Sequence, residues 1–152
     1  MKKSFILFAS LFLLFTSSAF AQRGTAKTTV SGKKIEIEYG QPKLQGRDML
    51  AKLPAGGTWR MGMNDATTLT TEATLKIGNK VVEPGKYTLT AKRVTEDSWH
   101  LIIKPNSGDN IEVPLNNEER SELVETFTIT LDPGHFSMEW GAMRVGTDFE
   151  AK

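Results

Sequence analysis

Apolar and polar residues alternate along most of this chain with the two-residue period that is typical of β-strands. Ile35, Ile37 and Tyr39 alternate with charged residues, so residues 34–39 are predicted to form a strand with one buried and one wet face. The same alternation, or a run rich in β-branched residues, recurs in the segments 66–71, 73–77, 81–82, 87–91, 99–103, 111–113, 123–131 and 135–145. These segments predict a protein built almost entirely of strands.

Turn signals separate the predicted strands. Gly78-Asn79 is typical of a two-residue hairpin, and the runs 83–85 and 105–108, which contain Pro and Gly, are typical of wider turns. Pro114 is expected to stop the short edge strand that begins at Ile111, and residues 117–122 are the one segment with the character of a short helix. We therefore predict an all-β, single-domain β-sandwich of about eight or nine mainly antiparallel strands, with a small β-barrel as the alternative.

Residues 1–21 have the composition of a secretory signal peptide. Lys2 and Lys3 give a positive start, residues 5–15 form an apolar run, and Ala19 and Ala21 provide the small side chains that signal peptidase requires. The apolar run is shorter than the roughly 20 residues that span a bilayer, which disfavours the alternative of an uncleaved membrane anchor. We expect cleavage before Gln22 and a mature protein that is periplasmic or extracellular.

The mature part, residues 22–152, is predicted to be a single domain that buries about two thirds of its unfolded surface. The full chain has 19 basic and 18 acidic side chains, and removal of Lys2 and Lys3 changes its formal charge from +1 to −1. No basic block in the mature part is longer than two residues. Nucleic acid is therefore not expected as a partner.

The chain contains no cysteine. This composition excludes a disulfide scaffold, catalysis by a thiol and metal sites made of thiolates, and it excludes a lipid anchor attached to cysteine. No cofactor is indicated by any motif. Stability is expected to come from the apolar core.

Three motifs stand out in the mature part. The first is Y-G-Q-P at residues 39–42 followed by G-R at 46–47, the second is W-R-M-G-M-N-D-A-T at 59–67, and the third is P-G-K-Y at 84–87. In these motifs the chain resembles a family of exported proteins of unknown function that is common in Bacteroidetes. The resemblance covers about residues 35–103 and, more loosely, 124–145, and it implies a β-sandwich without an assigned activity.

Two places depart from the pattern of that family. Gln41 stands where the family often has arginine, and Met61 and Met63 stand where smaller residues are usual. An anion site that depends on residue 41 is therefore not expected in this chain.

The segment around Trp59 is the best candidate for a binding site, because its glycines allow the backbone to approach a ligand closely. Trp59 offers a stacking face, Arg60 a planar fork of donors for a carboxylate, phosphate or sugar, and Asn64 a paired donor and acceptor. Tyr39 and Arg47 are expected to join them if the strand 34–39 lies alongside. These five residues form the predicted ligand site.

A structural role is the alternative for the same segment. Trp59 would then add its large apolar surface to the core, and Arg60 would pair with Asp65 or Asp48. The two interpretations differ in the exposure of Trp59 and in the partners of Arg60.

The other tryptophans and the two histidines are predicted to have structural roles. Trp99 and Trp140 alternate with apolar neighbours on their strands, so we expect both to pack in the core. His100 and His135 are far apart in sequence, and neither lies at a familiar metal-ligand spacing from a second histidine or a carboxylate. We expect both at the surface or in structural contacts.

Methionine provides the one soft-ligand alternative. Met61 and Met63, with Met138 and Met143 elsewhere in the chain, could bind Cu(I) through their thioethers in an exported protein. Filling of the core is the more common use of methionine.

Signatures of enzymes are missing from the sequence. It has no G-x-S-x-G elbow, no S-x-x-K, no H-E-x-x-H, no P-loop and no dinucleotide fingerprint. A hydrolase would therefore need carboxylates that the fold brings together, and its candidates are Glu36, Glu38, Asp65, Glu125 and Glu139. Strand alternation places Glu36 and Glu38 on the solvated face, where no catalytic role is needed to explain them.

These observations predict a periplasmic or secreted ligand-binding or interaction module whose partner is a small molecule, a glycan or a protein. The alternatives are a hydrolytic enzyme that uses carboxylates brought together by the fold, and a Cu(I)-binding protein. No membrane segment is expected after processing.

Overall fold

The computed structural model describes residues 22–119 and 122–152, so the predicted signal peptide lies outside the described residues. The described part contains only strands and their connections, and it has no helix of the length and apolar character needed to cross a membrane. The strands are β1 (Arg23–Val30), β2 (Lys33–Gly40), β3 (Thr58–Trp59), β4 (Thr67–Thr71), β5 (Leu75–Ile77), β6 (Lys80–Val82), β7 (Gly85–Thr95), β8 (Ser98–Lys104), β9 (Ile111–Asn117), β10 (Val124–Asp132), β11 (His135–Gly141), β12 (Met143–Asp148) and β13 (Glu150–Ala151).

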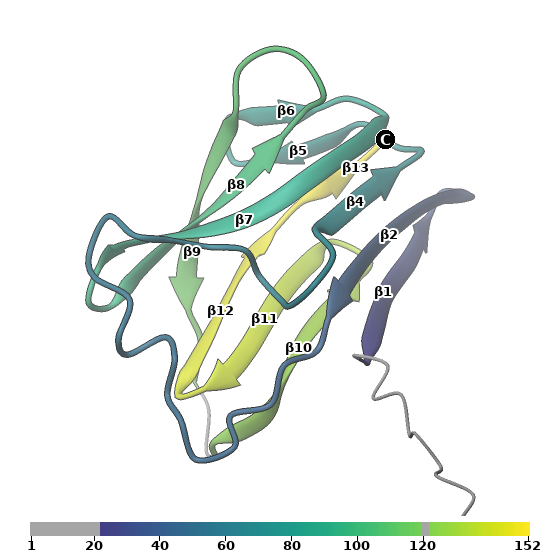
Figure 1. Cartoon of the computed structure of the whole chain (residues 1–152). Coiled ribbons are helices and arrows are strands. Elements are labelled where there is room, and N and C mark those ends of the chain that lie inside the picture. Colours follow the sequence, from purple (N-terminus) through teal and green to yellow (C-terminus); the bar gives the residue numbers. More distant parts are fainter. Residues whose placement is uncertain (1–21, 120–121) are drawn as a thin grey trace, which may run out of the picture.

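A 10-stranded antiparallel sheet makes up most of the molecule. Its strands follow the order β1-β2-β4-β7-β8-β9-β12-β11-β10, and β3 pairs with β7. The sheet curls until β1 lies beside β10, which nearly closes it into a barrel (Figure 1). The predicted all-β class is confirmed, and the architecture fits both the predicted β-sandwich and its alternative, a small barrel.

The chain that follows β2 helps to bring the two edges of this sheet together. Lys43 forms an isolated antiparallel bridge with Thr126 of β10. Tyr39, at the end of β2, is buried, and its hydroxyl accepts a hydrogen bond from the backbone N–H of Ile129 at 3.1 Å. These contacts join β2 and the chain that follows it to β10, the strand beside which β1 also lies.

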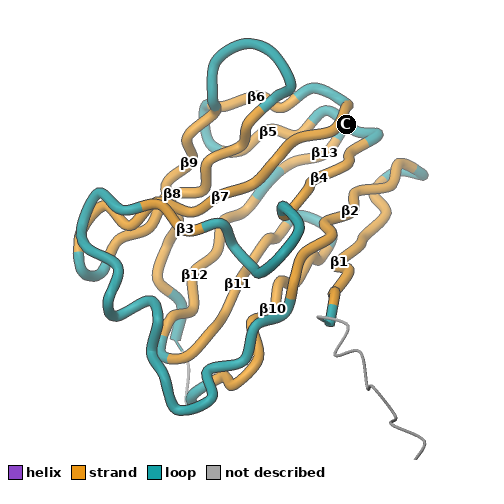
Figure 2. Tube along the Cα trace, in the orientation of Figure 1, coloured by secondary structure: helices purple, strands orange, loops and turns teal. Residues whose placement is uncertain are grey.

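The two ends of the curled sheet differ. One end is covered by a 3-stranded sheet in the order β13-β5-β6, whose Leu75, Ile77 and Val82 belong to the hydrophobic core. At the other end the long β2–β3 connection, residues 41–57, runs past the ends of β10, β11 and β12, as the loop colouring of Figure 2 shows. Connections of this length without regular structure are uncommon and often functional.

Alternation along the chain correctly identifies the core. Ile35, Ile37 and Tyr39 are 0%, 2% and 3% exposed, and the charged residues between them face outward. Trp99 and Trp140 are buried in the same core, as predicted.

Strand boundaries differ from the sequence prediction in two places. β1 is absent from the prediction because its residues are mostly Thr, Lys and Gly, with Ala26 as its one buried apolar side chain. Residues 135–145 were expected as one segment, but Gly141 has a φ of +60°, and a turn there separates β11 from β12. The C-terminal region is therefore a hairpin.

Two further expectations are wrong. Pro114 does not stop a strand but lies inside β9, opposite His100 of β8. It is tolerated because β12 pairs with β9 only at Asn116 and Asn117, which leaves the second edge of β9 unpaired at Pro114. The predicted helical turn at 117–122 is also not formed in its described residues, since Asn117 ends β9 and the next two residues have no regular structure.

Candidate functional site

A cavity of about 390 Å³ lies between the β2–β3 connection and the neighbouring end of the large sheet. We call it the cationic cavity, because basic but no acidic side chains line it. Its lining residues are Pro42, Lys43, Leu44, Gln45, Arg47, Met49, Leu50, Leu53, Trp59, Gly62 and Trp140. The volume lies toward the lower end of the roughly 300–1,000 Å³ that is typical of small-molecule sites.

Stacked aromatic rings form one wall of this cavity. Trp59 of β3 and Trp140 of β11 lie nearly parallel, with their ring centroids 5.4 Å apart and an interplanar angle of 16°. Phe127 is completely buried behind them and meets Trp59 edge to face at 4.7 Å. The indole N–H of Trp140 donates to the backbone oxygen of Glu125 at 3.2 Å. The wall is therefore fixed by packing and by a hydrogen bond, while Trp59 itself stays partly exposed.

The charged rim of the cavity comes from the first half of the connection. Lys43 and Arg47 are both exposed, and no ion pair engages either of them within the described ranges. The backbone N–H groups of Leu44 and Gln45 donate to the backbone oxygen and the carboxylate of Glu125, at 2.9 and 3.0 Å. This part of the loop is therefore held on β10, with its two cations exposed to solvent.

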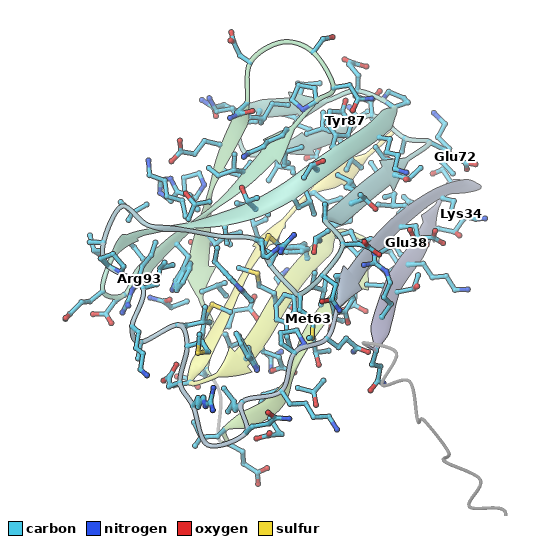
Figure 3. All side chains as sticks on the ribbon, in the orientation of Figure 1. Lys34, Glu38, Met63, Glu72, Tyr87 and Arg93 are labelled. Carbon is cyan, nitrogen blue, oxygen red and sulfur yellow. The ribbon has the colours of Figure 1, made fainter. Side chains whose placement is uncertain are left out.

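Arg93 of β7 holds the second half of the connection. Its Nη1 donates to the backbone oxygens of Leu50 at 2.9 Å and Leu53 at 2.7 Å. Its Nε and Nη2 donate to the backbone oxygen of Glu96 at 3.2 and 2.8 Å. It also lies 5.9 Å from the ring centre of Trp99. Figure 3 shows Arg93 close to this loop. One side chain thus fixes the turn that carries two residues of the cavity wall.

Close backbone packing positions the segment that follows Trp59. Gly62 has a φ of +150°, and a Cβ on it would lie 2.9 Å from the backbone oxygen of Gly40. A Cβ on Gly40 would likewise overlap the backbone oxygen of Met63. The buried hydroxyl of Thr67 donates to the oxygen of Met61 at 2.6 Å. The first two sequence motifs therefore cross each other at Gly40 and Gly62, where only glycine fits.

The five residues of the predicted site are not all brought together. Trp59 and Arg47 line the cationic cavity. Arg60 and Asn64 are exposed outside its lining, where the guanidinium of Arg60 donates to the backbone oxygen of Asn64 at 2.6 Å. Tyr39 lies in the core with its hydroxyl bonded to β10. Sequence reasoning missed Lys43 and Trp140, which reach the cavity from a loop and from a distant strand.

The alternative ion pairs of Arg60 are not formed. Asp65 pairs with Arg23 at 3.9 Å, and Asp48 accepts a hydrogen bond from the backbone N–H of Ala51 at 3.0 Å. Within residues 22–119 and 122–152 no ion pair joins Arg60 to either aspartate.

Two of the methionines considered as Cu(I) ligands pack in the core. Met61 and Met138 are completely buried in the core, and Met63, labelled in Figure 3, is half-buried. No cluster of three or more His, Asp or Glu residues able to hold a metal is found in the part of the chain that the structure describes. Because the sulfur of Met61 is surrounded by core residues, we do not propose a Cu(I) site.

His135 lies in a network of charged residues where β11 begins, beside the end of β12. Its Nδ1 is 2.6 Å from Asp148 and its Nε2 is 2.8 Å from Glu118, whose second oxygen is 3.2 Å from Arg144. The hydrogen bond to Asp148, helped by Glu118, raises the pKa of His135 above its ordinary value. A Cβ on Gly146 would overlap Glu118, so glycine leaves room for this carboxylate.

His100 has a simpler environment on the outside of the sheet. Its Nδ1 is 2.6 Å from the carboxylate of Glu112, which also lies 3.7 Å from the amine of Lys92. The hydrogen bond with His100 lowers the pKa of Glu112, and Lys92 acts in the same direction. Both histidines therefore contact carboxylates near the surface.

The carboxylates considered for a hydrolase are spread over the molecule. Glu36 and Glu38 lie on β2, Asp65 in the β3–β4 connection, Glu125 on β10 and Glu139 on β11. None of them lines the cationic cavity. The lining of this cavity therefore lacks the carboxylate pair that acid–base hydrolysis would use there.

Comparison with known proteins identifies one family. The sequence model of a family described as "Protein of unknown function (DUF2911)" matches residues 21–149. No curated protein and no solved structure matches the chain.

Proposed function

We propose that this chain, which belongs to the DUF2911 family of proteins of unknown function, is an exported module. In this proposal the module binds a small molecule in the cationic cavity. The observation that carries this proposal is the cavity itself, where a stacked pair of tryptophans faces a loop that bears two cations. Sites for small molecules typically combine a mostly apolar wall with a few polar groups that orient the ligand.

Rigid positioning supports a binding role. The walls of the cavity come from β3, β11 and a loop that is held at both halves, by Glu125 on one side and by Arg93 on the other. A loop ordered before binding costs less entropy when the ligand arrives. The proposed site therefore resembles a preformed pocket and not a mobile surface loop.

Export is the second part of the proposal. It is supported by the positive start, the apolar run and the small residues Ala19 and Ala21. Gln22, the residue expected to become the N-terminus, already takes part in the fold through its backbone oxygen, which accepts a hydrogen bond from Gln41 at 2.9 Å. Mass spectrometry of the mature N-terminus tests this part, and a mature protein that still carries residues 1–21 would contradict it.

Native mass spectrometry tests the binding role. Protein purified from the cell envelope of its own source should carry a small molecule that is lost on denaturation. A variant that fills the cavity, Leu53→Trp, should bind no such molecule, because Leu53 is one of the residues that line the cavity. Val81→Trp is the matched control, since Val81 is exposed on the distant small sheet.

The control separates loss of the cavity from the general effect of a large new side chain. Both variants should first be compared with the unmodified protein in a thermal melt. If Leu53→Trp stays folded and retains the same small molecule, or if the unmodified protein carries none, the cavity is not a binding site.

A further inference from the structure

Charge is distributed unequally across the wall that bounds the cationic cavity. A second cavity, of about 540 Å³, lies on the other side of Leu50 and Trp140, which line both. Its lining includes four carboxylates, from Asp48, Glu96, Asp97 and Glu118. The lining of the cationic cavity includes none. The same loop and the same tryptophan thus separate an acidic from a basic environment.

The basic residues of the acidic side are already engaged. Arg93 is bound to backbone oxygens of the loop and of Glu96. Arg144 lies between Glu118 and Glu139, at 3.2 and 3.6 Å. By contrast, the cations of Lys43 and Arg47 have no carboxylate partner within the described residues. The cationic cavity is therefore the side that can offer unpaired positive charge to a ligand.

We propose that the ligand of the cationic cavity is an organic anion with a flat apolar body, such as an aromatic carboxylate. This inference rests on the proposed function and names its ligand class. The body stacks beside Trp59, and the acid group lies at the rim, where the guanidinium of Arg47 offers paired donors that match the geometry of a carboxylate. Lys43 adds a second, flexible positive charge.

Charge selects among ligands with the same body. An aromatic amine of equal size would meet two like charges at this rim, and it would be favoured in the acidic cavity across Leu50. An uncharged alcohol would gain the stacking contact but no ion pair. The order of affinity at the cationic cavity should therefore be carboxylate, alcohol, amine.

Three matched compounds test this order: naphthalene-2-carboxylate, 2-naphthylmethanol and 2-naphthylmethylammonium. Their dissociation constants are measured by calorimetry and by tryptophan fluorescence at low ionic strength. Arg47→Gln and Lys43→Gln should each weaken the carboxylate about 2- to 5-fold, the range expected for exposed ion pairs, and leave the alcohol unchanged. Added salt should have the same effect as these substitutions.

Lys76→Gln is the matched control, because Lys76 is an exposed cation on β5 of the distant small sheet. The proposal is overturned if the carboxylate does not bind saturably, if it binds no better than the alcohol, or if the Arg47 and Lys43 variants bind it as well as the Lys76 variant does. The Leu53→Trp variant distinguishes the two levels. Suppose that the unmodified protein binds the alcohol and the carboxylate equally well and that Leu53→Trp binds neither. The cavity is then still a binding site, and only the proposed ligand class is wrong.

Discussion

Arg93 should contribute more to stability than a surface ion pair such as Arg23–Asp65, although no carboxylate among the described residues pairs with it. Replacement by alanine removes the donors for the backbone oxygens of Leu50, Leu53 and Glu96, of which the shortest bonds are 2.7, 2.8 and 2.9 Å. A hydrogen bond contributes about 0.5–1.5 kcal/mol net, so three of them amount to about 2–4 kcal/mol for a half-buried group. Arg23→Ala, which removes an exposed 3.9 Å pair, should cost less than about 0.5 kcal/mol.

Denaturation in urea measures both variants, and amide hydrogen exchange locates the effect. In Arg93→Ala, exchange should accelerate first at Leu53, whose N–H donates to the oxygen of Leu50 at 3.1 Å within the same turn. Arg93→Lys should recover part of the loss, because one ammonium cannot reach the oxygens on both sides of the guanidinium. A loss in Arg93→Ala no larger than that in Arg23→Ala, with unchanged exchange at Leu53, would refute the role of Arg93 in holding the loop.

Two further predictions concern a titrating residue and a glycine. Because the hydrogen bond to Asp148 raises the pKa of His135, the protonated form stabilises the fold below about pH 6.5, and this contribution is lost as pH rises through the raised value. In melts from pH 5 to 9, the advantage of the unmodified protein over His135→Gln should shrink with rising pH, and a constant difference would contradict the assignment. Gly62→Ala should lower the free energy of unfolding by at least about 2 kcal/mol more than Gly32→Ala does. Both glycines have a positive φ, but only at Gly62 would the new Cβ also lie 2.9 Å from a backbone oxygen. Equal losses in urea denaturation would show that the crossing at Gly62 relaxes freely.

The sequence predicts the core better than it predicts the connections. Period-two alternation places Ile35 and Ile37 inside because one face of a strand must be buried, and this holds wherever strands are regular. β1 escapes detection because its pairing with β2 depends on backbone hydrogen bonds and not on apolar side chains. The turn at Gly141 is not predicted from the sequence, because it follows an apolar strand without the usual pair of turn residues.

The candidate site was predicted only in part, because sequence motifs reveal local residues but not contacts between distant segments. Trp59 and Arg47 belong to recognisable motifs, and both reach the cavity. Trp140 reaches it from a strand far along the chain, and Arg93 acts on backbone oxygens of residues about forty positions away, a contact that leaves no mark in the pattern of side chains. Tyr39 was correctly placed on the buried face of its strand but then assigned to a ligand, although its hydroxyl has a partner in β10.

The order of strands in the large sheet has a consequence for the way the chain acquires its structure. β12 lies between β9 and β11, and β13 pairs with β5, so residues 143–151 take up places beside strands that precede them in the sequence, in the case of β5 by a long stretch of chain. Neither sheet can be completed until residues 143–151 have left the ribosome. Such non-local pairing is slow to form, because the closure of long loops must precede the contacts that stabilise them. A precursor that stays unfolded throughout its synthesis is the form that a translocation channel can thread, and this topology therefore suits the export that we propose.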